Sequence, residues 1–164
     1  MINKDLKNAK ILIVDDQESN VQILSDLLEL AGYDNVVTTT DSRKVMKIVK
    51  EIDPDLILLD LMMPKLSGFD IMDLLKEEMQ KSLNPNKYLP ILVLTADITP
   101  EVRLKALDAG AKDFLSKPFN LVEVKHRIRN LLETQYLFQL LKEKNQTMEE
   151  KMINFLKLNN DWYR

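Results

Sequence analysis

Residues 56–70 read LILLDLMMPKLSGFD, a short apolar run that ends in an aspartate and leads into a helical pattern. The run is apolar at successive positions, which is typical of a strand whose two faces are both buried. Beyond it, apolar residues recur at helical spacing from Phe69 to Met79. A buried strand followed by an amphipathic helix is the repeating unit of a parallel sheet. This stretch therefore predicts one such unit.

The same alternation of strand and helix patterns occurs along most of the chain. The expected strands are residues 10–14, 35–39, 55–59, 91–95 and 112–116. Their order predicts an α/β fold, in which an open five-stranded parallel sheet is doubly wound and carries helices on both faces. Residues 80–90 interrupt the pattern and are predicted to form a loop.

A long helical extension is predicted at the C-terminal end. After Pro118 the sequence contains neither glycine nor proline. A helix over most of residues 120–162 would be about 60 Å long at a rise of about 1.5 Å per residue, which exceeds the width of a small domain. We therefore expect this helix to project from the sheet.

Composition excludes several classes of protein. The chain has 164 residues and only 3 glycines, which are far apart, so no glycine-rich phosphate loop can form. It has no cysteine and 1 histidine, which excludes disulfides, thiolate chemistry and multi-histidine metal sites. No apolar run is long enough to span a membrane and no apolar signal region is present, so we expect a cytoplasmic protein without a membrane partner. The net charge of the chain is −3, and its C-terminal tail is only mildly basic. Both facts argue against direct nucleic-acid binding.

Polar side chains follow the predicted strands at one edge of the sheet. They are Asp15 and Asp16 after the first strand, Asp60 after the third, Thr95 at the end of the fourth and Lys117 after the fifth. In doubly wound sheets, ligands bind beyond the carboxyl ends of the strands. Carboxylates without histidine or cysteine favour a hard cation such as Mg²⁺, for which Mn²⁺ can substitute. A turn-forming or capping role explains any single residue equally well, but it explains the whole set poorly.

These groups suit the transfer of a phosphoryl group to a carboxylate. A metal ion and a lysine neutralise the phosphoryl oxygens while the carboxylate attacks in line. Asp60 is the best candidate for the nucleophile because it ends the buried run of the expected central strand. Asp15 and Asp16 are better placed as metal ligands, and Lys117 as the contact to a phosphoryl oxygen.

Four separately spaced segments resemble the receiver domain of two-component response regulators. They are ILIVDD (11–16), LILLDLMMPKLSGFD (56–70), VLTA (93–96) and FLSKPF (114–119). The resemblance extends from residue 10 to about 130 and implies a flavodoxin-like fold. It divides the chain into an N-terminal lead (1–9), a phosphoaccepting receiver domain (10–130) and a C-terminal helical or coiled-coil extension (131–164).

The resemblance also implies a role for each residue at the strand ends. Asp60 would accept a phosphoryl group from a histidine kinase or a phosphotransfer protein. Lys117 would contact that group, and its peptide bond to the next residue is usually cis in this family. Asp16 would bind Mg²⁺ directly and Asp15 through water. Asp60 and the backbone carbonyl of Met62 would complete the protein ligands.

Two further pairs of residues gain a role from the resemblance. Thr95 and Phe114 would be switch residues that move toward the new phosphate and repack an output surface, although Phe114 also fits an ordinary buried aromatic. Met62 and Asp97 would flank the path of the water that hydrolyses the acyl phosphate. An apolar Met62 cannot orient that water, so we expect the phosphorylated form to last minutes or longer. Asp97 would act in the opposite direction.

The tail carries a heptad pattern typical of a coiled coil. Its expected dimer seam consists of Phe138, Leu141, Asn145, Met148, Met152 and Phe155. Asparagine at the a position of the heptad, at Asn145 and again at Asn159, favours a parallel two-stranded homodimer. The alternative is an amphipathic helix that packs on its own receiver or on a missing domain. The segment is similar to linkers that join receivers to cyclic-di-GMP-metabolising output domains, notably HD-GYP phosphodiesterases, so an output domain or protein is a further expected partner.

These patterns predict a response-regulator receiver that takes part in its own phosphotransfer and is not a multiple-turnover enzyme. A haloacid-dehalogenase-type phosphatase also forms an aspartyl phosphate with Mg²⁺. That family needs a second aspartate two residues after the nucleophile, where Met62 stands here. A degenerate receiver that serves only as a dimerisation scaffold is the other alternative, and the complete acidic set argues against it.

Overall fold

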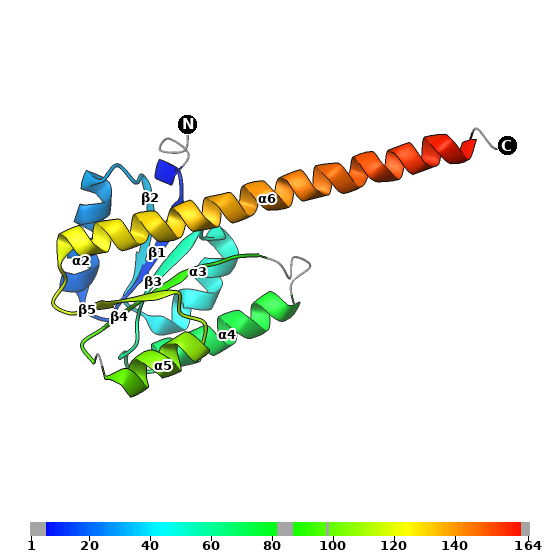
Figure 1. The fold of residues 1–164 in the computed structure, drawn as a ribbon. Helices are drawn as coiled ribbons and strands as arrows, with labels where there is room; N and C mark the ends of the chain where they lie inside the picture. The colour runs from blue at the N-terminus through cyan, green and yellow to red at the C-terminus, as the bar shows by residue number, and fades with distance from the viewer. Residues whose placement is uncertain (1–5, 82–86, 98, 162–164) are drawn as a thin grey trace.

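The computed structural model describes residues 6–81, 87–97 and 99–161, and side chains as far as residue 157. Its five strands are β1 (Lys10–Val14), β2 (Asn35–Thr39), β3 (Leu56–Asp60), β4 (Ile91–Thr95) and β5 (Asp113–Ser116). They form one parallel sheet in the order β2-β1-β3-β4-β5 (Figure 1). This order confirms the predicted open, doubly wound fold.

The third strand begins and ends one residue later than predicted. Its pairing with β1 starts at Leu56, which lies opposite Ile11. The preceding Asp55 instead uses its carboxylate to accept a hydrogen bond from the Lys10 N–H at 2.9 Å. Asp60 is consequently the last residue of β3, and strand pairing with β4 holds its backbone.

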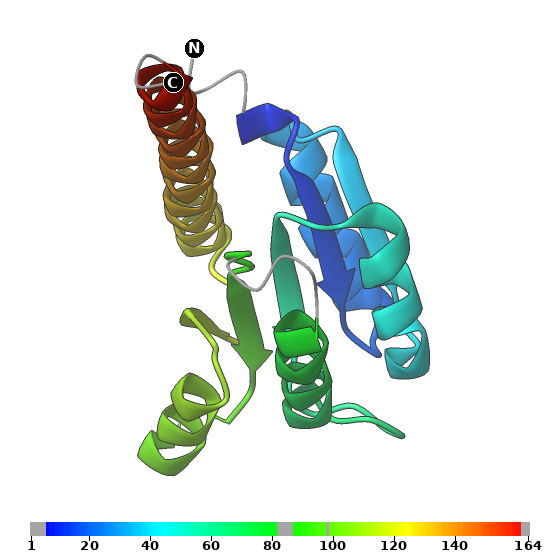
Figure 2. The same ribbon diagram turned by 90° about the vertical axis from the view of Figure 1, so that its right-hand side faces the viewer.

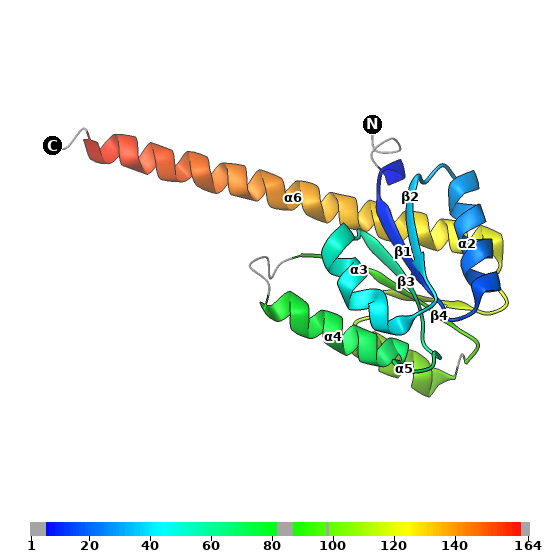
Figure 3. The ribbon, with the colours of Figure 1, turned by 180° about the vertical axis from the view of Figure 1, so that it is seen from behind.

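Helices cover both faces of the sheet. They are α2 (Glu18–Leu30), α3 (Val45–Ile52) with the preceding 3₁₀ turn η1 (Ser42–Lys44), α4 (Gly68–Lys81), α5 (Pro100–Asp108) and α6 (Leu121–Asp161). Successive residues of β1 alternate between the two faces: Ile11 and Ile13 pack with α2 and α6, whereas Leu12 and Val14 pack with α3, α4 and α5. Accordingly, α6 lies in front of the sheet in Figure 1 and behind it in Figure 3.

The start of α4 touches the end of β3. A Cβ atom on Gly68 would lie 2.5 Å from the backbone oxygen of Asp60, so this approach requires glycine. At its other end α4 continues to Lys81. The loop that was predicted over residues 80–90 therefore begins later than expected, and its residues 82–86 lie outside the described part of the chain.

The C-terminal helix α6 is a single element of 41 residues. Ile128 and Leu132 bury its first part against the sheet, and the buried Gln135 donates a hydrogen bond to Asp55 Oδ1 at 3.1 Å. Beyond residue 136, none of the α6 side chains that the structure describes is buried. Figures 1 and 3 show the helix continuing past the body of the domain, which confirms the predicted projecting helix, and Figure 2 views the same helix nearly end-on. In the described chain, no helix combines the length and apolar character needed to cross a membrane.

The residues just before β1 also contribute to the core. Leu6 and Ala9 are buried among the apolar residues under α2 and α6. Asn35 Nδ2 donates a hydrogen bond to the carbonyl of Asn8 at 2.9 Å, which ties this segment to β2. Residues 6–9 thus pack as part of the sheet domain.

Candidate functional site

Three carboxylates converge at the carboxyl ends of two neighbouring strands. Asp15 and Asp16 follow β1 directly, and Asp60 ends β3, which pairs with β1. One carboxylate oxygen from each residue lies within 4.8 Å of the others. Asp15 and Asp60 are buried, and Asp16 is the most accessible of the three. The structure thus brings together the aspartates that the sequence predicted to be neighbours.

Lys117 bridges two of these carboxylates. Its Nζ atom lies 2.7 Å from Asp15 Oδ2 and 3.2 Å from Asp60 Oδ2. Lys117 follows β5 directly, and its backbone N–H donates to the Thr95 carbonyl at 2.9 Å. The peptide bond from Lys117 to Pro118 is cis, as the resemblance implied. With all groups ionised, the single ammonium leaves an excess of negative charge among the three carboxylates, which suits a divalent cation.

The oxygen atoms of this cluster fit a hard cation. Asp16 Oδ1 is buried and has no hydrogen-bond partner among the described residues. A buried carboxylate oxygen without a donor is costly, and a bound cation would satisfy it. Met62 contacts the cluster through its backbone N–H, which donates to Asp60 Oδ1 at 3.3 Å. Because the three aspartates offer only oxygen atoms as metal ligands, the cluster matches Mg²⁺ or Mn²⁺.

The environment of Asp60 disfavours its negative charge. Burial raises the pKa of the Asp60 carboxyl above its ordinary value of 3.8. The Lys117 ammonium partly opposes this rise in pKa, whereas the negative charge of Asp15 adds to it. At neutral pH the ionised form of Asp60 therefore lowers the free energy of unfolding of the chain.

Removal of the Asp60 charge is expected to stabilise the cation-free fold. Because the pKa of Asp60 is higher in the folded than in the unfolded chain, folding stability falls as the pH rises from 3.8 through the raised pKa. In EDTA at neutral pH, we expect Asp60→Asn to increase the free energy of unfolding, because it removes a buried charge that the folded chain disfavours. We expect the gain to shrink in acidic buffer. Urea unfolding followed by circular dichroism measures both effects.

The matched control is Asp26→Asn, which removes one exposed negative charge from α2. It is expected to leave the free energy of unfolding nearly unchanged at both pH values. A lower stability of Asp60→Asn than of the wild type at neutral pH would contradict the prediction.

Thr95 and Asp97 shape the turn that follows β4. The buried Thr95 hydroxyl donates to the Asp97 carbonyl at 3.1 Å and accepts from the Asp97 N–H at 3.0 Å. The Asp97 carboxylate accepts a hydrogen bond from the Thr99 N–H at 2.9 Å. Both residues lie at the predicted edge of the sheet, and their side chains are engaged with this turn.

Phe114 connects β5 to α5. It lies opposite Val93 of β4 and packs, half-buried, with the core under α3, α4 and α5. The guanidinium carbon of Arg103, on α5, lies 5.0 Å from the centroid of the Phe114 ring, within the range of a cation–π contact. The side chain predicted as a switch therefore contacts α5.

Two residues at the start of α2 contact the site but were missed in the sequence. The Gln17 N–H donates to Asp15 Oδ1 at 2.9 Å. Asn20 Nδ2 lies 3.2 Å from both oxygens of Asp15. Side chains of a helix tilt toward its N-terminus, so a polar residue in the first turn after a strand points back toward the strand end. That spacing is the signal that would have indicated Asn20.

The predicted dimer seam is exposed over most of its length. Met148, Met152 and Phe155 are 68, 60 and 63 % exposed, and Leu141 is similarly accessible. The side chain of Asn159 lies outside the part of the chain that the structure describes. The outer half of α6 thus carries a row of apolar side chains that its own domain leaves uncovered.

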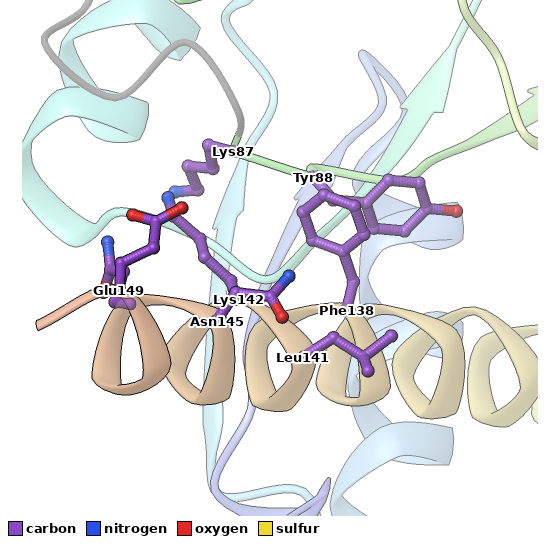
Figure 4. A pocket seen from close by; sticks show the side chains of 8 residues that line it. Lys87, Tyr88, Phe138, Leu141, Lys142, Asn145 and Glu149 are labelled. Carbon is purple, nitrogen blue, oxygen red and sulfur yellow. The ribbon is translucent and has the colours of Figure 1, made fainter. Parts of the chain in front are cut away.

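Phe138, the first residue of the predicted seam, packs within its own chain. Its ring centroid lies 5.3 Å from that of Tyr88, in the segment that leads into β4. Figure 4 shows the two rings side by side, with Leu141 and Asn145 following along the same stretch of α6. These residues line a cavity between α6 and the approach to β4. Phe138 therefore serves the attachment of α6 to the domain, and the uncovered part of the seam begins at Leu141.

Comparisons with known proteins agree with this geometry. A family model described as the response regulator receiver domain matches residues 11–129. The transcriptional regulatory protein PhoP of alkaline phosphatase synthesis, from Bacillus subtilis, is 39% identical over 147 residues, which cover 89% of this chain and 58% of PhoP. The transcriptional regulatory protein CpxR of Escherichia coli is 36% identical over 127 residues, which cover 77% of this chain and 50% of CpxR. This chain thus spans about half the length of the curated relatives it matches.

Solved structures share the architecture over most of their length. The chemotaxis protein CheY4 of Vibrio cholerae superposes with a TM-score of 0.67 and 31% identity, covering 76% of this chain and 98% of CheY4. The receiver domain of the Francisella response regulator 1452 superposes with a TM-score of 0.68 and 27% identity, covering 77% of this chain and 98% of that domain. In both cases almost the whole of the solved chain finds its counterpart here.

Proposed function

Because this chain belongs to the receiver domains of two-component response regulators, we propose that Asp60 is its phosphoryl acceptor. A histidine kinase or a phosphotransfer protein is the proposed donor. The observation that supports this most directly is the Lys117 ammonium, which lies within 3.2 Å of both Asp15 and Asp60. The neighbouring Asp16 oxygen without a partner adds to that support. The haloacid-dehalogenase alternative is not favoured, because the relatives are regulators of this family.

The proposed reaction is an attack by an Asp60 carboxylate oxygen on the phosphorus of a phosphohistidine. The new oxygen–phosphorus bond forms as the nitrogen–phosphorus bond breaks, and the imidazole of the donor leaves with its nitrogen lone pair and takes up a proton from solvent. Receiver domains bind Mg²⁺ at an acidic pocket of this kind, and the bound ion neutralises phosphoryl oxygens. Lys117 supplies a second positive charge next to Asp60.

We propose unequal roles for the three aspartates at the cation. Both oxygens of Asp15 already contact donors, from Gln17, Asn20 and Lys117. No described residue donates a hydrogen bond to the buried Oδ1 of Asp16. This difference supports direct binding of the cation by Asp16 and Asp60 and water-mediated binding by Asp15. The backbone carbonyl of Met62 is the remaining proposed ligand.

The direct test is the uptake of one phosphoryl group from acetyl phosphate in the presence of Mg²⁺, measured by intact mass. A parallel assay with a generic phosphatase substrate separates this function from that of an enzyme. We expect no sustained release of phosphate over many turnovers, since receivers are generally not multiple-turnover enzymes. Steady multiple turnover would contradict the proposed function.

The phosphorylated form is expected to persist for minutes or longer. Met62 is 69 % exposed beside Asp60 and offers no group that orients an attacking water. Asp97 is tied to the Thr99 N–H in the turn after β4. Loss of the phosphoryl group from purified phosphoprotein, followed by intact mass over time, measures the lifetime. We expect Met62→Asn, which introduces a polar group, to shorten it, and release by the wild type within seconds would refute the prediction.

The proposed switch connects Asp60 to α5 and α6. On phosphorylation, the Thr95 hydroxyl turns from the Asp97 carbonyl, to which it donates, toward a new phosphoryl oxygen, and Phe114 follows it inward. The cation–π contact between Arg103 and Phe114 supports a coupling of this movement to α5. Because the phosphoryl group makes contacts in only one of the two states, it shifts the population toward that state.

We propose that α6 carries the signal outward as a parallel homodimer. Leu141, Met148, Met152 and Phe155 follow heptad spacing and are exposed, and Asn145 stands at a position that favours two strands in register. The output is a domain or protein that contacts this helix. PhoP and CpxR are named transcriptional regulators, but the portion matched here is the receiver half.

A further inference from the structure

Asn20 makes a contact with the acidic cluster that its side-chain chemistry suits. It lies in the first turn of α2, and its Nδ2 atom is 3.2 Å from Asp15 Oδ1 and 3.2 Å from Asp15 Oδ2. The same Nδ2 lies 3.3 Å from Gln17 Oε1. The Asn20 amide group is therefore held between Asp15 and the residue that precedes α2.

The contact matters because Asp15 is fully buried. A buried carboxylate needs donors on both oxygens to remain charged. Oδ1 receives the Gln17 N–H at 2.9 Å, and Oδ2 faces the Lys117 ammonium at 2.7 Å. Asn20 is the neutral donor that reaches both oxygens, and it therefore fixes the plane of the carboxylate.

Without Asn20, the strongest remaining attraction on Asp15 would be Lys117. The Asp15–Lys117 distance of 2.7 Å is already shorter than the Lys117–Asp60 distance of 3.2 Å. A carboxylate released from the amide would be free to rotate about its Cβ–Cγ bond and to present its second oxygen to the ammonium as well. An ion pair inside the cluster competes with an added cation for the same negative charge.

We propose that Asn20 is a positioning residue for the divalent-cation site, which it serves by orienting Asp15. The inference rests on the proposed function in one respect, namely that Mg²⁺ binds at this cluster. Groups that orient a metal-binding carboxylate through hydrogen bonds change metal affinity by about 10- to 100-fold when they are removed. Since Asp15 is proposed to act through water, the lower end of that range applies.

The test is the dissociation constant of Mg²⁺ for the unphosphorylated full chain, measured by isothermal titration calorimetry. Asn20→Ala removes the amide at a helical position where alanine is well tolerated, and we expect it to raise the dissociation constant by about 10-fold. Asn20→Gln keeps the donor on a longer side chain, and its value is expected to lie nearer to that of the wild type than to that of Asn20→Ala.

The matched control is Gln22→Ala. Gln22 lies on the exposed side of the same helix, where its amide donates to Asp26 Oδ1 at 2.6 Å. We expect this variant to bind Mg²⁺ as the wild type does. Thermal unfolding in EDTA accompanies each titration, because a role limited to folding would lower the unfolding temperature without changing the Mg²⁺ affinity of the folded chain.

The outcomes separate the two proposals. A wild type that binds no Mg²⁺ overturns the proposed cation site itself. A wild type that binds, with Asn20→Ala binding equally well, overturns only the role of Asn20. An equal loss in Asn20→Ala and Asn20→Gln also overturns it, because the effect would then not follow the amide donor.

Discussion

The wild-type chain, incubated with acetyl phosphate and Mg²⁺, is expected to gain one phosphoryl group, and Asp60→Asn is expected to gain none. Asp60 is the residue of the cluster that strand pairing holds in place, at the end of β3. An amide in its position keeps the shape of the side chain but removes the nucleophilic oxygen anion. We therefore expect the phosphoryl adduct on the wild type and its complete absence on Asp60→Asn, a difference that intact mass measures directly.

The control for this experiment is Asp26→Asn, which alters an exposed aspartate on α2 and should be phosphorylated as the wild type is. Omission of Mg²⁺ or addition of EDTA should prevent the adduct in every variant. If Asp60→Asn still gained the adduct, the phosphoryl acceptor would be another residue. No adduct on the wild type under any condition would end the proposed function.

The second large effect is expected in the oligomeric state. We predict that the wild type sediments as a dimer and that Met152→Glu sediments as a monomer. Met152 is 60 % exposed in the single chain, and the proposed seam would bury it against its counterpart. Two unpaired carboxylates forced into an apolar seam cost several kcal/mol, on the order of 2–5 kcal/mol per interface. We therefore expect the charge pair to dissociate the dimer.

Ile153→Glu is the matched control for the seam. Ile153 neighbours Met152, is 50 % exposed and lies off the heptad positions of the seam, so the same added charge there should leave the dimer intact. A wild type that sediments as a monomer, or a Met152→Glu variant that stays dimeric, would rule out the seam as proposed.

The absence of cysteine in this sequence allows the orientation of the helices to be tested without background. In a parallel dimer in register, Met148→Cys would face its own counterpart, at a distance that suits a disulfide. Glu150→Cys would point away from the partner helix and should remain reduced. Rapid oxidation of the first variant and not the second is the expected result, and the reverse would indicate a different pairing.

The strands could be predicted closely because their burial is written in consecutive apolar residues. The apolar run of Ile57, Leu58 and Leu59 indicates by itself that these residues lie inside a sheet. The predicted start of β3 was one residue early because the carboxylate of Asp55 accepts a hydrogen bond from the neighbouring strand. The end of α4 was harder to predict. Residues 80 and 81 are polar and exposed and suit a helix or a loop equally well, so no local pattern indicates that α4 continues to Lys81.

The candidate site could be predicted to the extent that strand ends define it. Asp15, Asp60 and Lys117 follow from topology alone, because parallel strands bring their carboxyl ends to one edge. Asn20 does not follow from the strand ends in the same way, and its one signal is its place in the first helical turn after β1, from which a side chain tilts back toward the strand end. The pairing of Phe138 with Tyr88 joins residues far apart in sequence, and no local pattern encodes it.

The continuity of α6 has a mechanical consequence. The chain contains no glycine or proline after Pro118, and one helix runs from residues buried against the sheet to residues far outside it. Ile128 and Phe155 are about 40 Å apart along such a helix. A helix without a flexible joint acts as a stiff shaft, so a small twist where Ile128 meets the sheet turns the distant apolar row through the same angle. Under the proposed switch, a rotation of α6 at the sheet would therefore reach the distant apolar row at its full angle.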